Sequence, residues 1–210
     1  MTVTISVEHD GAESARKGLE RCAAAGGVVL FPADGLYGLA CDPLDQAAIE
    51  RIHRLKGRDD GKPSAVLYFS PLAMRELVEG LGDRTRAAVG ALLPGPVTVV
   101  VDNPQRRYPL ACREDSERLG LRLIDGPLAG AMCPVFQTSA NRSGEPAPAT
   151  FAEVPPGILS GADVAIDGGA LPGSPSTVVD LTALDSGGEW TVLRQGGMPA
   201  EELRERLGAL

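Results

Sequence analysis

Three cations lie within seven residues of one another: Lys56, Arg58 and Lys62. The first two follow a segment with helical spacing, and Lys62 comes after the charged residues Asp59 and Asp60. The planar fork of arginine and the point charge of lysine both suit phosphate oxygens, so the group can converge on a triphosphate. The alternative is a solvated basic helix end that complements the helix dipole and is neutralised by the two aspartates. The spacing alone leaves both interpretations open.

A second candidate is the run Thr138-Ser139-Ala140-Asn141-Arg142-Ser143-Gly144, which follows a predicted strand. Its short polar side chains and backbone N–H groups can bind an anion or a sugar, but the same residue types also favour turns and caps. Two further candidates are Ser176, in the segment 174–177, and Arg194, which follows a predicted strand. Neither is distinctive by itself.

Several site classes are absent from the pattern. The sequence has no G-x-x-x-x-G-K-[ST] phosphate loop and no G-x-S-x-G nucleophile motif, so a Walker-type site and a serine hydrolase are both disfavoured. The four cysteines form no C-x-x-C pair, and neither His9 nor His53 lies near a cysteine cluster. A structural zinc site or a disulfide framework is therefore not expected.

The elements that must position these residues are helices and strands without a clean βαβ alternation. We predict helices over 10–25, 45–56, 71–80, 83–92, 126–132 and 199–207, and strands over 28–31, 65–69, 97–101, 119–123, 135–137, 164–166, 177–181 and 190–193. Residues 32–39 and 138–144 are predicted as loops directly after strands, where α/β proteins commonly bind ligands. No domain boundary is evident, so we expect one α/β domain over residues 1–210 with a mixed sheet.

The total charge sets a further limit. The 210 residues carry 20 Lys+Arg and 28 Asp+Glu, a formal net charge of −8. Only three of the basic residues are lysines. Such a balance disfavours a protein that coats a polyanion with a broad basic surface. The N-terminus lacks a signal-peptide pattern and no apolar run approaches 18 residues, so we expect a cytoplasmic protein without a membrane anchor.

Taken in order, seven segments resemble the YrdC-like family, whose best-known members are threonylcarbamoyl-AMP synthases. The resemblance rests on residues 28–39, 56–58 with 62–63, 93–98, 120–122, 138–144, 176–182 and 193–196. It implies a twisted mixed parallel/antiparallel sheet with flanking helices and a concave cavity. It also implies a nucleotidyltransferase that joins L-threonine, bicarbonate and ATP into threonylcarbamoyl-AMP and pyrophosphate, for threonylcarbamoyladenosine formation in tRNA.

The resemblance assigns roles residue by residue. Lys56 and Arg58 are expected to be catalytic and to contact the ATP phosphates with Lys62, while Asn141 and Arg194 hold the nucleotide. Arg122 is expected to pair with the threonine carboxylate, and Ser139 and Ser176 to bind the substrate or the transferring group. Magnesium would arrive with ATP, without a metal site of protein side chains. The chain also looks like the short form of the family, which is expected to need partner proteins for transfer to tRNA.

Some positions depart from the family pattern. The loop after the first predicted buried strand usually reads Pro-Thr-Asp/Glu-Thr, but Ala33 and Gly35 stand in place of both threonines, and Ala149 stands where a hydroxyl residue is common. A hydroxyl that the family pattern places near the amino-acid substrate is therefore absent. Two alternatives follow: a paralogue in which Ala33 and Gly35 enlarge the pocket for another acceptor, or a non-catalytic module for double-stranded RNA or tRNA.

Overall fold

The computed structural model describes residues 1–57 and 62–208. Ten strands form one mixed sheet in the order β1-β8-β2-β3-β7-β4-β6-β5-β9-β10. The strands are β1 (Val3–Ser6), β2 (Val29–Pro32), β3 (Tyr37–Cys41), β4 (Ala65–Tyr68), β5 (Val97–Asp102), β6 (Arg118–Leu123), β7 (Val135–Ser139), β8 (Val164–Asp167), β9 (Thr177–Asp180) and β10 (Thr191–Arg194). This is the mixed α/β architecture that the sequence predicts.

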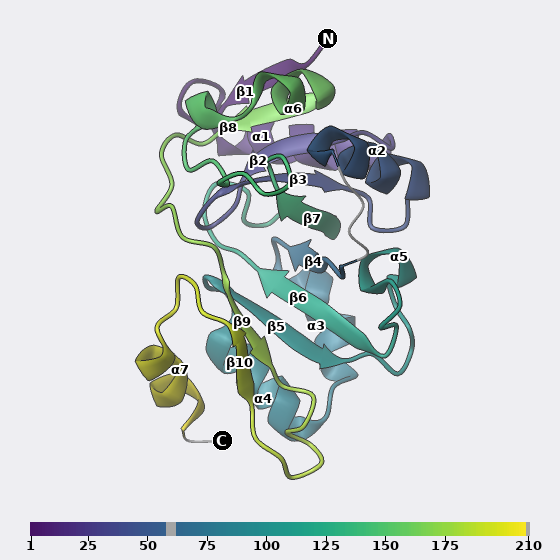
Figure 1. Ribbon diagram of the computed structural model, residues 1–210, viewed down its shortest axis with the longest axis vertical. Helices are drawn as coiled ribbons and strands as arrows, with labels where there is room; N and C mark the ends of the chain where they lie inside the picture. Colours follow the sequence, from purple (N-terminus) through teal and green to yellow (C-terminus); the bar gives the residue numbers. More distant parts are fainter. Residues whose placement is uncertain (58–61, 209–210) are drawn as a thin grey trace.

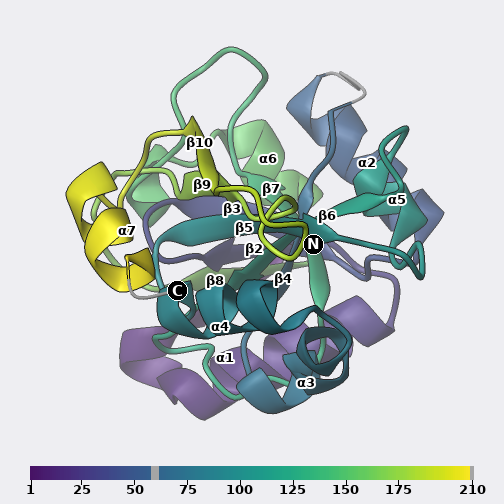
Figure 2. The same cartoon turned by 90° about the horizontal axis from the view of Figure 1, so that it is seen from below.

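Helices lie on both faces of the sheet (Figures 1 and 2). α1 (Val7–Ala24), α3 (Pro71–Glu79) and α4 (Asp83–Leu92) cover one face. On the other side are α2 (Gln46–Lys56) and α6 (Pro156–Gly161), which follows the short 3₁₀ turn η1 (Phe151–Glu153). The short α5 (Pro109–Cys112) packs beside β4 and β6, and α7 (Ala200–Leu207) packs against α4. No described helix is long and apolar enough to cross a membrane.

Local sequence signals explain the helix that leads to the predicted cations. The Asp45 side chain caps the N-terminus of α2 by accepting from the backbone N–H of Ala48 at 3.0 Å. Ala48, Ile49 and Ile52 form its buried stripe. Gly57 ends the helix with a φ of 75°, the left-handed conformation that glycine adopts without steric cost. Lys56 is thereby fixed at the last turn of α2.

Some predicted elements differ from the structure. Residues 126–132 form turns instead of a helix, because Gly126 and Gly130 both adopt positive φ, which a right-handed helix cannot contain. β3 occupies most of the second half of the predicted ligand loop, and β7 continues through Thr138 and Ser139. β1 and α5 were not predicted. Helix α1 begins earlier than expected but is broken at Gly11, which has a φ of 83°.

One connection crosses from one half of the sheet to the other. The strap, residues 168–176, links β8 to β9 and runs down the left of Figure 1. β8 pairs in parallel with β1 and β2, whereas β9 pairs in parallel with β5 and antiparallel with β10. The strap therefore joins two groups of strands that the β3-β7-β4-β6 portion of the sheet separates.

Candidate functional site

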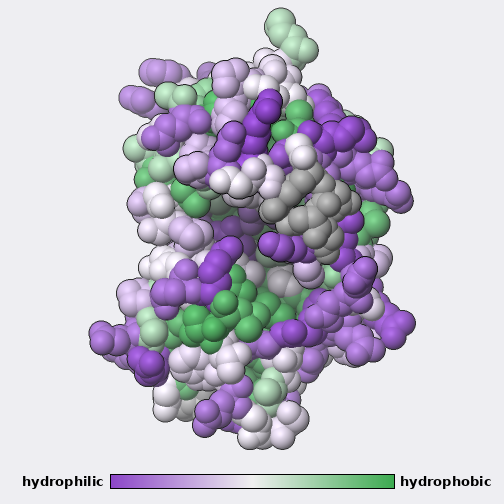
Figure 3. All heavy atoms as spheres, viewed as in Figure 1, coloured by the Kyte–Doolittle hydropathy of each residue, from purple (hydrophilic) through white to green (hydrophobic). Residues whose placement is uncertain are grey.

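A cavity of about 470 Å³ lies between the two halves of the sheet. The face of the molecule that is seen in Figure 3 is hollowed at mid-height, and hydrophobic residues lie beside the hollow. The lining includes polar side chains from the β2–β3 turn, β5, β6, β7, the strap and β10: Asp34, Thr98, Arg118, Arg122, Gln137, Thr138, Ser139, Ser174, Ser176 and Arg194. Val100, Val178 and Leu193 add an apolar part. The cavity thus combines cations, hydroxyls and an apolar wall.

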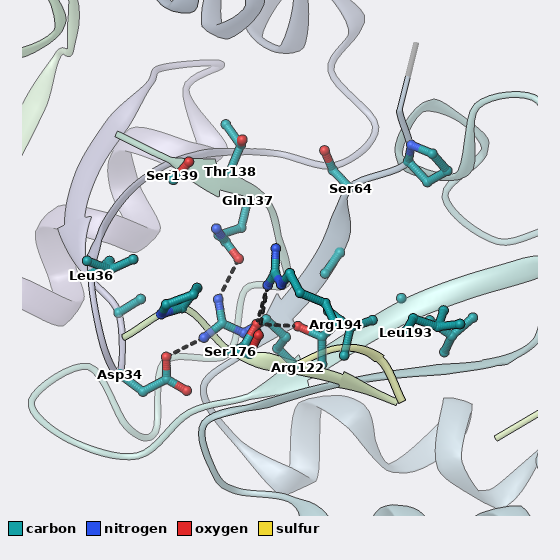
Figure 4. A pocket seen from close by; sticks show the side chains of 18 of the residues that line it. Asp34, Leu36, Ser64, Arg122, Gln137, Thr138, Ser139, Ser176, Leu193 and Arg194 are labelled. Atoms are coloured by element: carbon teal, nitrogen blue, oxygen red, sulfur yellow. Dashed lines mark hydrogen bonds and ion pairs between the residues drawn. The ribbon is translucent and has the colours of Figure 1, made fainter. Parts of the chain in front are cut away.

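Arg122 lies at the centre of this arrangement (Figure 4). It belongs to β6, and its side chain is only 7% exposed. One terminal nitrogen, Nη1, donates to Gln137 Oε1 at 2.7 Å, and the other, Nη2, forms an ion pair with Asp34 Oδ1. Asp34 Oδ2 and Arg122 Nε are buried without a hydrogen-bond partner among the described residues. Asp34 thus compensates the buried charge of Arg122, and each partner keeps one unsatisfied polar atom.

Arg194 lies close to Arg122 and is held differently (Figure 4). Its Nη2 donates to the Ser176 carbonyl at 2.8 Å and to the Ser176 hydroxyl at 3.2 Å. Burial, and then the neighbouring charge of Arg122, lower the pKa of Arg194. Within residues 1–57 and 62–208, no carboxylate forms an ion pair with this guanidinium. An uncompensated arginine beside a second one, both lining a cavity, forms a site for an anion.

Thr98 is linked to Arg194 through Ser176. Its hydroxyl is buried and lies 2.8 Å from the Ser176 hydroxyl. Thr98 and Ser176 come from the neighbouring segments β5 and the strap, since Val97 pairs with Thr177 in the sheet. Thr98 therefore orients the Ser176 hydroxyl, which also accepts from Arg194.

Lys56, Ser139 and Asn141 form a separate cluster at the upper edge of the cavity. Lys56 Nζ is buried and donates to the Ser139 carbonyl, to the Asn141 carbonyl at 3.0 Å and to Asn141 Oδ1 at 3.2 Å. The Ser139 hydroxyl donates to Asn141 Oδ1 at 2.5 Å. Of the three, only Ser139 lines the cavity. These three residues therefore lie together, and Lys56 holds the 139–141 segment in place. The contact of Lys56 with a phosphate stays a prediction.

The remaining predicted cations lie at the mouth of the cavity or beyond the described part. Lys62 is exposed and precedes Pro63 and Ser64, which line the cavity. Arg58, predicted as a catalytic phosphate ligand, lies outside the described residues. Among the described residues, no group of three or more His, Cys, Asp or Glu side chains is placed to hold a metal ion.

Sequence patterns left several lining residues without a role. Asp34 lies in the β2–β3 loop, Gln137 lies next to a matched segment and Thr98 lies within one. No local sequence signal shows that Asp34 and Gln137 contact Arg122, or that Thr98 contacts Ser176. Arg118 was not singled out; it forms an ion pair with Asp180 and lies 3.7 Å from Asp115 Oδ2. The contacts of Asp34 with Arg122, of Thr98 with Ser176 and of Arg118 with Asp180 join residues 88, 78 and 62 positions apart in sequence. Only the sheet topology brings them together.

The space beside Gly35 is filled by the protein itself. A Cβ atom on Gly35 would lie 2.0 Å from the Ser174 carbonyl oxygen, which belongs to the strap. The expectation that Gly35 enlarges the pocket is therefore wrong, because the backbone of the strap occupies the position that a side chain would take.

Fold and site together define an α/β protein with a cavity that is partly lined by arginines and lies where strands from two halves of one sheet meet. Residues 21–196 match the family model for Sua5, YciO and YrdC, described as "Telomere recombination". The chain is 34% identical over 176 residues to the threonylcarbamoyl-AMP synthase of Thiobacillus denitrificans, which covers 80% of this chain and 92% of the relative. The chain therefore belongs to the Sua5/YciO/YrdC family.

Solved structures agree with this assignment. Sua5 of Pyrococcus abyssi complexed with L-threonine superposes with a TM-score of 0.80 at 25% sequence identity, over 99% of this chain and 61% of that protein. E. coli YciO superposes with a TM-score of 0.79 at 22% identity, over 97% of this chain and 98% of that protein, which supports the fold alone.

Proposed function

We propose that this chain is an ATP-dependent L-threonylcarbamoyladenylate synthase. The observation that carries the proposal is the pair Arg122 and Arg194 in one cavity, only the first of which has a carboxylate partner among the described residues. Family membership supports the same activity, because matched relatives are named threonylcarbamoyl-AMP synthases.

The proposed reaction needs positioning and charge stabilisation. The ammonium group of threonine loses a proton, and the resulting amine combines with bicarbonate to give a carbamate and water. A carbamate oxygen then attacks the α-phosphorus of ATP, and the bond to the β-phosphate oxygen breaks to release pyrophosphate. Negative charge gathers on the phosphate oxygens during this step, and guanidinium groups stabilise it. No covalent nucleophile on the protein is required.

Each residue has a proposed part. Arg194 binds a phosphate or the forming carbamoyl phosphoanhydride, with the Ser176 hydroxyl beside it. Arg122 has N–H groups left after its bonds to Asp34 and Gln137, and these receive the threonine carboxylate. Lys56 holds Ser139 and Asn141 in place for the nucleotide, and Arg58 and Lys62 contact the triphosphate, as the sequence predicts.

Magnesium would enter with ATP. Within the part of the chain that the structure describes, the acidic residues that line the cavity are Asp34, which pairs with Arg122, and Asp115, which lies near Arg118. These two fit a cation held mainly by phosphate oxygens and water, which is how magnesium usually binds nucleotides. A cytoplasmic location and a later transfer to tRNA, with partner proteins, complete the proposal.

Pyrophosphate release by the purified chain tests this function. With ATP, magnesium, bicarbonate and L-threonine, we expect release that stops when either threonine or bicarbonate is omitted, together with a product of the mass of threonylcarbamoyl-AMP. A folded protein that releases no threonine-dependent pyrophosphate would contradict the proposal. The double-stranded RNA alternative is tested in parallel, because binding through phosphate contacts falls steeply as salt increases.

A further inference from the structure

The lower part of the strap is held by backbone contacts on both sides of the cavity. On one side, the Gly173 N–H donates to the Gly35 carbonyl at 2.9 Å, and the Ser174 carbonyl lies against the Cα of Gly35. On the other side, the Gly197 N–H donates to the Pro175 carbonyl at 2.8 Å. A Cβ on Gly196 would lie 2.3 Å from that same carbonyl oxygen. Because Gly35 and Gly196 have no side chains, the strap packs directly against both halves of the sheet.

The conformation of Ser174 is restricted further by its neighbours in sequence. Pro175 fixes its own φ and confines the preceding residue to extended conformations. Gly173 has a φ of 82°, which orients the turn before Ser174. Residues 173–176 therefore form a wall with little conformational freedom.

The Ser174 hydroxyl is the polar group that this wall leaves available to a ligand. Ser174 is exposed and lines the cavity, and its side chain has no hydrogen-bond partner among the described residues. It contacts Gly35, the residue after Asp34, and Asp34 in turn binds Arg122. A hydroxyl held rigidly at this place can donate to or accept from a polar group of a substrate whose carboxylate binds Arg122.

We propose that Ser174 determines which amino acid is carbamoylated, by a hydrogen bond to the side-chain hydroxyl of the acceptor, and that Gly35 makes this possible by admitting the strap. The inference rests on the proposed function, since it names the recognition of the acceptor substrate in that same cavity. Because the contacts at Gly35 and Gly196 already restrict Ser174, little further conformational entropy is lost when the substrate binds.

Competing acceptors test the proposal. L-threonine and L-valine differ by a hydroxyl and a methyl group, so the ratio of their kcat/KM values measures recognition of the hydroxyl. In Ser174→Ala we expect this ratio to fall about tenfold while the KM for ATP stays unchanged, since Ser174 is partly open to water and loses one hydrogen bond. Ser174→Thr keeps a hydroxyl and should recover most of the preference. Ser14→Ala, at an exposed serine of α1, is the matched control.

The role of Gly35 is tested with Gly35→Ala, whose Cβ would collide with the Ser174 carbonyl. We expect kcat/KM for threonine to fall at least about tenfold, because the wall must move. Gly90→Ala is the matched control, since a Cβ there meets nothing within 4 Å. Wild-type preference for threonine in Ser174→Ala would overturn the assignment of Ser174, and wild-type kcat/KM in Gly35→Ala would overturn the role of Gly35.

A binding measurement separates this inference from the proposed function. The shift in melting temperature produced by threonine, compared with that produced by valine, is recorded for wild type and Ser174→Ala without ATP. If wild type releases no pyrophosphate but Ser174→Ala loses the preference for threonine, the assignment of Ser174 stands and the proposed reaction fails. If wild type neither turns over nor binds threonine in preference to valine, both are overturned.

Discussion

Two arginines in the same cavity have different electrostatic partners. Arg122 is paired with Asp34 and bonded to Gln137, whereas the partners of Arg194 among the described residues are two neutral oxygens of Ser176. A bound anion would relieve the repulsion between the two guanidinium groups and would replace water around Arg194. We therefore expect the pair at Arg122 to contribute more to stability than Arg194, and Arg194 to contribute more to anion binding.

The first prediction follows from that difference. Arg194→Ala should lower kcat/KM by on the order of a hundredfold, because a cation that stabilises developing charge is lost. The melting temperature should change by no more than about 2 °C, since no ion pair to a carboxylate is broken. Steady-state kinetics and thermal unfolding measure the two effects, with Arg206→Ala in α7 as a control. Undiminished turnover in Arg194→Ala would exclude it from the anion site.

Thr177 holds the loop that follows Arg194. Its fully buried hydroxyl donates to the Met198 carbonyl at 2.7 Å and accepts from the N–H groups of Gly196 at 3.0 Å and Met198 at 3.1 Å. Thr177→Val keeps the shape but removes the acceptor of the Gly196 and Met198 N–H groups, whereas the Met198 carbonyl keeps its bond from Gln195 Nε2 at 2.6 Å. We therefore expect a loss of about 2 kcal/mol in the free energy of unfolding. Urea unfolding measures it, and Thr177→Ser should recover much of the loss. A valine variant as stable as wild type would contradict this assignment.

At the scale of elements, Asp163 joins three of them. Its carboxylate accepts from Arg51 in α2 at 2.7 and 3.1 Å and from the Val28 N–H before β2 at 2.8 Å, and it directly precedes β8. Partial burial raises the pKa of Asp163, but the hydrogen bonds from Arg51 and Val28 and the charge of Arg51 together hold it below its ordinary value. Protonating this carboxyl therefore weakens the contact between α2 and the sheet.

The pH dependence of stability tests this. A carboxyl with a lowered pKa in the folded state contributes stability that is present above its unfolded pKa, near 4, and is lost as pH falls through the folded value. Between about pH 5 and about pH 2, the melting temperature should fall less steeply in Asp163→Asn than in wild type. Asp125→Asn, in the loop after β6, is the control. Equal slopes for wild type and Asp163→Asn would contradict the role of this contact.

Predictability from sequence also differs between elements. α2 was predicted because its cap, its apolar stripe and its terminal glycine are all local signals. β3 was read as part of a loop because Gly35 and Gly38 interrupt the pattern, although Gly38 pairs with Phe31 and Ser139 inside the sheet. Residues 126–132 looked helical by composition, but two glycines with positive φ turn the chain there. Sheet pairing decided the first case, and the backbone conformation of the two glycines decided the second.

The candidate site was predictable to the same extent. Arg122, Ser139, Ser176 and Arg194 were found from matched segments, and all four line the cavity. Asp34 and Thr98 were found only in the structure, because their partners Arg122 and Ser176 are 88 and 78 residues away in sequence. The contact between the strap and Gly35 was likewise found only in the structure, because no local sequence pattern predicts it.

For the whole molecule, the distribution of charge matters more than its total. Residues 1–149 carry 17 basic and 19 acidic residues, whereas residues 150–210 carry 3 and 9. The net charge of −8 excludes a broad basic surface, but three arginines still line one cavity: Arg118, Arg122 and Arg194. Walls of low polarity beside them, such as Val100 and Leu193, strengthen their field toward a bound anion.

A ligand that contacts both halves of the sheet should stabilise the entire domain. At a concentration of an ATP analogue about 100 times its Kd, the folded state gains about 2.7 kcal/mol. For a chain of this length, that corresponds to a rise of roughly 5 to 10 °C in melting temperature. Thermal unfolding with magnesium and a non-hydrolysable analogue measures it. No shift under saturating conditions, established by a direct binding measurement, would contradict this coupling.

The strap also has a consequence for the order in which the chain folds. It connects β8, which pairs near the N-terminal strands, to β9, which pairs with β5, so its contacts close large loops and form only between already paired strands. Substitutions at Gly35 or Gly196 should therefore speed unfolding far more than they slow refolding. Stopped-flow kinetics in denaturant measure this. For each substitution, the change in the activation free energy of folding should be close to zero relative to the change in the free energy of unfolding. A nearly complete sheet would then precede a functional cavity in time, and the last contacts to form would be those that bind substrate.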